Sequence, residues 1–232
     1  MSTLNRGSLR ARTASILRRN DLTTEINEWI NFVLREVTSR ISFPEMRVTA
    51  SKSLVVGTYK YDISADWSIT NFGTIDKLYY KDTTVTPSWG RELIFIPRYA
   101  YKQLGFERLL NVTTPISGDP FGYTLDNDTI WFDIAPSKTA TIVFTYYKIN
   151  TDLSADATEP DIAEKWRHHL IPMICSWGQM WIEKDDLNKI MYWENKFETQ
   201  IKKLRKLVMR SENQNMWIAA PSMGLEHGDK IY

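Results

Sequence analysis

The sequence predicts an α+β fold in which N-terminal and C-terminal helices form a bundle and an antiparallel β domain, a sandwich or a small barrel, is inserted between them. Apolar residues recur every three or four positions near both ends of the chain, which is the period of a helix face. Between residues 48 and 148 the period falls to two, as in strands. Residues 211–232 show neither period, which predicts an extended C-terminal arm.

These changes of period divide the chain into four expected segments. They are N-terminal helices over 1–46, the inserted β domain over 47–150, a linker with C-terminal helices over 151–210, and the arm over 211–232.

The first long helix is expected over residues 22–41, after a shorter helical piece around 9–18. Asp21 or a nearby threonine is a candidate N-cap, and Pro44 lies just past the end. Its apolar stripe consists of Leu22, Ile26, Trp29, Ile30, Val33, Val37 and Ile41. Because one amphipathic helix cannot bury such a stripe alone, we expect it to pack on the C-terminal helices.

The stretch DPFGYTLDNDTIWFDIAP, residues 119–136, has the pattern of a β-hairpin. Alternating apolar residues on both sides of Asp126–Asp128 predict two strands and a turn, with Trp131 and Asp133 on the opposite face from Ile130, Phe132 and Ile134. A calcium loop starting at Asp126 would need glycine where Trp131 stands and glutamate where Ser137 stands. The aspartates therefore do not predict a calcium site.

Two helices are expected after the polar, acidic linker NTDLSADATEPDIAE. Pro160 can begin the first of them, and Pro172 is expected to bend it. Asp185 or Asp186 is the expected N-cap of the second. Two apolar stripes support this: Ile162, Trp166, Leu170, Met173, Ile174, Trp177 and Trp181, and then Leu187, Ile190, Met191, Phe197, Ile201, Leu204 and Val208.

The sequence offers little for catalysis or metal binding. His168 and His169 would point about 100° apart on a helix, and Cys175 would lie roughly 10 Å further along it. Nucleophile-elbow, phosphate-loop, dinucleotide-binding and zinc-protease motifs do not occur. We therefore expect no enzyme, cofactor or metal. A nucleic-acid-binding protein that uses basic helix faces and, less favoured, a glycan-acting enzyme remain as alternatives.

Charge, cysteine content and the apolar runs of the sequence indicate in which compartment the protein is made. The net charge is +1, although residues 196–210 carry six basic residues against Glu198 alone. One cysteine rules out an internal disulfide and fits a reducing compartment. Since there is neither a signal-type apolar run nor a stretch of the roughly 20 apolar residues that a span needs, we expect a soluble protein made in the cytosol, with no membrane partner.

Four passages together resemble the head–tail adaptor (connector) proteins of tailed bacteriophages, including the tail tubular proteins of short-tailed phages. They are LTTEINEWINFVLREVTSRISFPEM, SLVVGTYKYDIS, DPFGYTLDNDTIWFDIAPSKTATIVFTYYKINTDLS and EKWRHHLIPMICSWGQMW, and the likeness covers residues 4–210. The third matches best, with a Pro-x-x-Tyr, a strand ending in proline and a strand ending in Tyr-Tyr at Pro120, Tyr123, Pro136, Tyr146 and Tyr147. The family's proline-aspartate after the first strand pair is missing from Tyr61–Ser64.

The resemblance implies a structural protein of the virion, made in the host bacterial cytoplasm. Such a protein forms a homo-oligomeric ring, commonly of twelve copies, that docks below the portal protein. The ring passes double-stranded DNA without reading its sequence and presents a platform to the next tail component, which is a nozzle, tube or head-completion protein.

The resemblance also suggests which residues would make these contacts. The basic face of the last helix, comprising Lys202, Lys203, Arg205, Lys206 and Arg210, is a candidate for the DNA channel or the portal, with plain solvation as the alternative. Trp217, Ile218, Ile231 and Tyr232 are candidate anchors of the C-terminal arm. Trp67, Phe72 and Trp89 are candidate tail-facing loop aromatics, with packing inside the β domain as the alternative.

Overall fold

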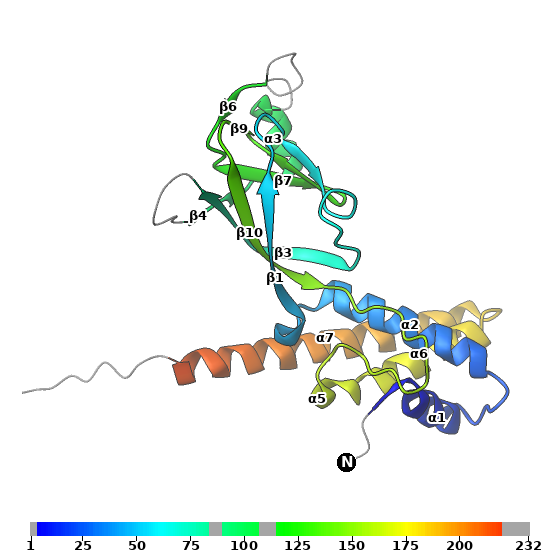
Figure 1. The fold of residues 1–232 in the computed structure, drawn as a ribbon. Helices are drawn as coiled ribbons and strands as arrows, with labels where there is room; N and C mark the ends of the chain where they lie inside the picture. The colour runs from blue at the N-terminus through cyan, green and yellow to red at the C-terminus, as the bar shows by residue number, and fades with distance from the viewer. Residues whose placement is uncertain (1–3, 84–89, 107–114, 220–232) are drawn as a thin grey trace, which may run out of the picture.

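The computed structural model describes residues 4–83, 90–106 and 115–219, and it confirms the α+β architecture. Helices from the two ends of the chain form one layer, and the β domain stands on it (Figure 1). The helices of this layer are α1 (Arg6–Leu17), α2 (Thr23–Arg40), α5 (Glu164–Arg167), α6 (Leu170–Ile182) and α7 (Leu187–Ala219). Within the described ranges, no helix combines the length and the apolar content that crossing a membrane requires.

Helix α6 lies at the centre of the bundle. It packs against α1 and α2 on one side and against α7 on the other. The apolar stripes expected from the sequence meet in one core, since Ile30, Val33, Leu170 and Ile174 are all fully buried. The two ends of the chain thus cover each other's apolar faces.

Of three helix starts, two have a side-chain cap and one does not. Asn5 caps α1 by accepting from the Ser8 backbone N–H at 2.9 Å. Asp186 caps α7, as expected, by accepting from the backbone N–H groups that follow it. The cap expected for α2 is wrong: Leu22 occupies the N-cap position without a side-chain hydrogen bond, because Asp21 pairs with Arg19 at 2.7 Å.

The C-terminal helices differ from expectation at two places. The predicted first helix is broken at His168–His169 into α5 and α6, and Pro172 does not bend it. Pro172 lies instead in the first turn of α6, where its missing N–H would have had no partner inside the helix. Helix α7 continues to Ala219, whereas an extended arm was expected from Ser211. Extending an existing helix needs no new nucleation, so a polar segment without an apolar stripe can continue it.

In the part of the β domain that the structure describes, the strands form two four-stranded sheets and a short two-stranded one. The first sheet has the order β1 (Arg47–Leu54), β10 (Ala140–Lys148), β3 (Phe72–Asp82), β4 (Gly90–Glu92). The second has the order β2 (Lys60–Asp62), β8 (Thr129–Phe132), β7 (Gly122–Asp126), β5 (Ile94–Phe95). Pairing is antiparallel except that β5 pairs with β7, and β6 (Ser117–Gly118) with β9 (Ala135–Pro136), in parallel.

The two large sheets share one aromatic core. Phe144 from the first sheet and Phe132 from the second are fully buried, and Trp67 packs between Tyr61 and Phe144. The 119–136 hairpin forms as expected, with Asn127 in the left-handed conformation at the turn (φ 52°).

One residue of this hairpin departs from the predicted alternation. Asp133 was expected on the face opposite the buried Phe132, but only 1% of it is exposed, because β8 ends at Phe132 and the alternation of its strand ends with it. The Asp133 carboxylate accepts from the backbone N–H groups of Phe121 and Gly122 at 3.1 and 3.0 Å. It therefore fixes the loop that leads into β7.

The segment between β10 and α5 has no regular secondary structure but is held against the bundle. Asn150 N–H donates to the Thr38 hydroxyl at 3.1 Å, and Leu153 N–H donates to Asn31 at 2.9 Å. The Arg167 guanidinium, 8% exposed, donates to the Ile162 and Pro160 carbonyls and to Glu159. These bonds anchor the β domain's return strand to the helices.

Candidate functional site

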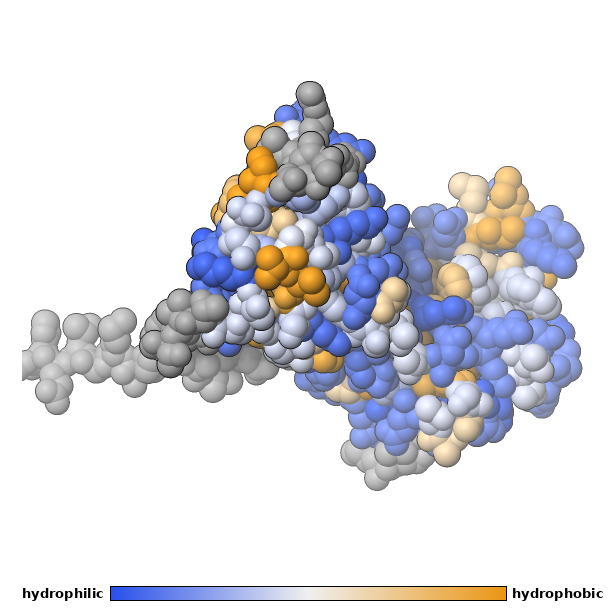
Figure 2. Space-filling model, turned by 45° about the horizontal axis from the view of Figure 1, so that its top comes forward, coloured by the Kyte–Doolittle hydropathy of each residue, from blue (hydrophilic) through white to orange (hydrophobic). Residues whose placement is uncertain are grey.

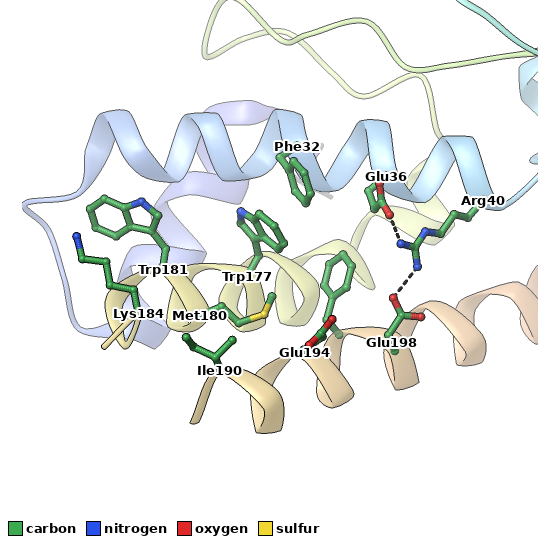
Figure 3. A pocket seen from close by; sticks show the side chains of 11 residues that line it. Phe32, Glu36, Arg40, Trp177, Met180, Trp181, Lys184, Ile190, Glu194 and Glu198 are labelled. Carbon is green, nitrogen blue, oxygen red and sulfur yellow. Dashed lines mark hydrogen bonds and ion pairs between the residues drawn. The ribbon is translucent and has the colours of Figure 1, made fainter. Parts of the chain in front are cut away.

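A groove lies between α2 and α7, over α6, and is called here the α2–α7 groove (Figure 3). Its volume is about 510 Å³. Its apolar lining consists of Phe32, Trp177, Met180, Trp181, Ile190 and Phe197. Its charged rim consists of Glu36, Arg40, Lys184, Glu194 and Glu198.

Stacked aromatic rings build the floor of this groove. Phe32 of α2 and Trp177 of α6 stack with centroids 3.8 Å apart and planes 17° apart. Trp177 also contacts Phe197 of α7, so one indole joins all three helices. Nearby, Trp29 packs against Trp181, of which 48% is exposed. The floor is therefore rigid and apolar, and one edge of it is open to solvent.

An arginine closes one end of the groove. The Arg40 guanidinium donates to Glu198 across the groove at 2.6 Å and also pairs with Glu36 on its own helix. Figure 3 shows both contacts at the end of the groove away from Lys184. The hydrogen bond to Glu198 is the main cause that raises the pKa of Arg40, so the bridge stays charged. It ties α2 to α7.

A second hollow lies between α1 and α7, over α6, called here the α1–α7 groove. It has a volume of about 380 Å³. Its lining comes from three helices: Ile16 and Leu17 of α1, Ile171, Pro172, Cys175, Ser176 and Gln179 of α6, and Trp193, Lys196 and Gln200 of α7. Ile16 is 61% exposed, which makes it the most prominent apolar side chain on its rim.

The single cysteine, which lines the α1–α7 groove, is not activated as a nucleophile. Burial raises the pKa of the Cys175 thiol to about 11, so the thiol is protonated and a poor nucleophile at neutral pH. Among the residues that the structure describes, no three His, Cys, Asp or Glu side chains lie together as metal ligands.

The sequence analysis assumed that His168 and His169 lie on one helix and point about 100° apart, and this is wrong. They form the turn between α5 and α6, and their rings approach to 3.9 Å. Burial, and then the neighbouring His168, lower the pKa of His169, which favours the neutral ring.

The basic residues proposed for the last helix all lie exposed on α7. At 100° per residue, Lys202, Lys203, Arg205, Lys206 and Arg210 fall within an arc of about 160°. The opposite side of the same turns is the buried one, with Ile201, Leu204 and Val208 facing the bundle. The helix therefore presents a continuous basic face to whatever lies beside the bundle.

The aromatic candidates have different environments. Trp67 is 3% exposed and belongs to the β-domain core, which favours the packing alternative. Phe72 is half-buried against Tyr146. Trp217 and Ile218 fall within the backbone of α7, not in an extended arm. Trp89, Ile231 and Tyr232 lie outside the described residues.

The tryptophans contribute less surface than their number suggested. Trp29, Trp67 and Trp166 are at most 9% exposed, so they build cores. Trp181, at 48%, is the most exposed of the tryptophans whose side chains the structure describes, a set without Trp89 and Trp217. Any contact between copies would therefore depend more on other apolar side chains.

An apolar edge of the β domain was missed by the sequence analysis. The edge strand β5 exposes 66% of Ile94 and 51% of Phe95, and the following helix α3 (Arg98–Gln103) exposes 69% of Tyr99. The segment reads as an ordinary buried strand in the sequence, and only its position at the sheet edge exposes it. Figure 2 shows apolar residues in separate patches, on the β domain and at the far end of the bundle.

A family model described as SU10 adaptor protein matches residues 4–220, nearly the whole chain. No curated protein matches the chain.

Proposed function

Because the chain belongs to the SU10 adaptor protein family of phage head–tail adaptors, we propose that it forms a ring that docks below the portal, surrounds the DNA path and carries the next tail component. The family is one of structural adaptors and not of enzymes. Twelve copies are the number that the resemblance suggests.

The observation that carries the proposal is the presence of apolar surface on several separate faces of one small chain. Large apolar side chains are exposed at Ile16 on α1, Trp181 on α6, Met191 on α7 and Phe95 on the β domain. Exposed apolar patches mark contacts with other proteins, and a subunit with neighbours on both sides and partners above and below would use such patches on several faces.

The two layers suggest a division of roles. The helical segments 1–46 and 151–210 would build the ring wall, and the β domain over 47–150 would project from it. Its edge at Ile94, Phe95 and Tyr99 is a better candidate for the tail component than Trp67, since these side chains are exposed. In the virion, this edge would face away from the capsid.

The basic face of α7 would lie toward the DNA or toward an acidic surface of the portal. The net charge of the whole chain is only +1. A bore lined by mixed charge lets DNA slide, whereas a strongly basic bore would hold the phosphates.

Mixing the purified chain with portal rings of the same phage, and imaging the product by negative stain, tests this function. The expected result is a second ring stacked on one face of the portal. Portal rings that remain bare at high chain concentration would contradict the proposal.

A nucleic-acid-binding role is the second candidate, because five exposed basic residues share one face of α7. This role predicts that the isolated chain binds duplex DNA with an affinity that falls steeply as salt rises, with a slope that reports several phosphates. The adaptor role predicts weak binding with a shallow slope. Fluorescence anisotropy of a labelled duplex at several salt concentrations separates the two.

A further inference from the structure

The two grooves lie on opposite faces of the central helix. The α2–α7 groove uses Trp177, Met180 and Trp181 of α6 and Lys184 just past its end, and the α1–α7 groove uses residues of α6 from Ile171 to Gln179. At 100° per residue the centres of these two sets lie about 160–200° apart around α6. One copy of the bundle therefore has two different hollowed sides.

The side with the α2–α7 groove is rich in carboxylates. Glu194 and Glu198 line the groove from α7, and Glu36 lines it from α2. Glu28 lies on the same face of α2, one and two turns from Phe32 and Glu36, and is exposed. The positive groups that line this groove are Arg40, which already bridges two of the glutamates, and Lys184.

The side with the α1–α7 groove has the opposite balance. Lys196 lines it, and Arg12 lies one turn from Ile16 on the exposed face of α1, a helix with no acidic residue. The nearby carboxylates are engaged, since Glu183 accepts from the Trp193 indole at 3.0 Å and Asp21 pairs with Arg19.

We propose that these two sides bind each other between successive copies of the chain, the carboxylate-rich α2–α7 groove of one copy receiving the basic α1–α7 side of the next. Each side repels a second copy of itself, because like charges would meet. The contact is therefore head-to-tail, the kind that closes into a ring. Exposed Ile16 provides the apolar side chain that enters the aromatic groove beside Trp181.

This inference rests on the proposed function, because it takes the ring as given and assigns the surfaces through which neighbouring copies meet. It names the surfaces of that ring and predicts a specific exchange of charges. Glu28, Glu194, Arg12 and Lys196 are all exposed, and none of them forms an ion pair with another described residue. Lys196 lies over the ring of Tyr192 at 5.2 Å, but that ring is itself exposed, so the four reversals should leave the fold intact.

The test uses two double variants of the full chain with portal rings as the template. One variant carries Glu28→Lys and Glu194→Lys, so both of its sides are basic. The other carries Arg12→Glu and Lys196→Glu, so both of its sides are acidic. Thermal unfolding by circular dichroism checks that each variant folds like the wild type.

Each variant alone is expected to form rings on portals at an occupancy about tenfold or more below that of the wild type, because like-charged sides would meet. An equimolar mixture of the two is expected to restore ring formation, since alternating copies again present opposite charges. A ring with an even number of copies allows that alternation. A chain that carries all four reversals should also assemble.

The outcomes separate this inference from the proposed function. Wild-type chain that leaves portals bare contradicts the proposed function itself. Wild-type rings accompanied by equally good rings from each variant alone would overturn only the inference. The same holds for two defective variants that fail to complement each other when mixed.

Discussion

Gly178 of α6 lies against the ring of Trp29 of α2, and replacing it with alanine tests the packing beneath the α2–α7 groove. A Cβ atom at Gly178 would lie 2.5 Å from Cζ3 and 2.7 Å from Cε3 of Trp29. Since carbon atoms pack at about 3.5–4.0 Å, the ring or the helix must move by about 1 Å. Trp29 is 3% exposed and packs against Trp181, so it has little room to move.

The expected magnitude follows from two opposing effects. Overpacking costs about 1–3 kcal/mol, and alanine gains up to about 1 kcal/mol over glycine in a helix. Gly178→Ala should therefore lower the free energy of unfolding by about 1–2 kcal/mol, as measured by urea unfolding followed by circular dichroism.

The same substitution in a Trp29→Leu variant tests whether contact with the indole causes the loss of stability. In a Trp29→Leu chain the indole is absent, so Gly178→Ala should be neutral or stabilising there, and the two changes should be strongly non-additive. Wild-type or higher stability of Gly178→Ala in the original background would refute the packing argument.

Three further predictions concern charged groups. Hydrogen bonds from Arg10, and secondly from Arg6, lower the pKa of Asp156, so its carboxylate stabilises the fold above its ordinary pKa, and that contribution is lost as pH falls through the lowered value. The variant Asp156→Asn should therefore be less stable than wild type at pH 7, and the two stabilities should converge in acid. Thermal melts in which the difference in stability stays constant with pH would contradict this. Burial raises the pKa of Asp133, so its contribution to stability is present at low pH and is lost as pH rises through the raised value. The variant Asp133→Asn should therefore be at least as stable as wild type at pH 7. A clear loss of stability of this variant in the same melts would count against the prediction. The variant Arg167→Lys should have a free energy of unfolding lower by about 2 kcal/mol or more, as measured by urea unfolding, because one ammonium cannot reach three oxygens that lie in different directions. A decrease in the free energy of unfolding that is within error of zero would contradict the anchoring role.

Local patterns in the sequence predicted much of the fold. The stripe over 22–41 gave α2 within a residue at each end, and Asp126–Asp128 gave the turn between β7 and β8. Both follow from short-range geometry, in which a helix face or a turn depends on residues a few positions apart.

The candidate surfaces depended on contacts that no local pattern contains. The α2–α7 groove needs Phe32 to stack on Trp177, which is far away in the sequence, and needs Gly178 to let Trp29 approach. The exposed edge at Ile94 and Phe95 depends on the order of strands in a sheet, which their own period does not reveal. The basic face of α7 was found from sequence because it lies on one helix.

Cryo-electron microscopy of the intact virion tests the central claim most directly. Density for a closed ring between portal and tail, into which both the helical layer and the β domain of this chain can be fitted, is the predicted result. A head–tail junction whose density accommodates neither layer, or this chain found at another place in the particle, would contradict it.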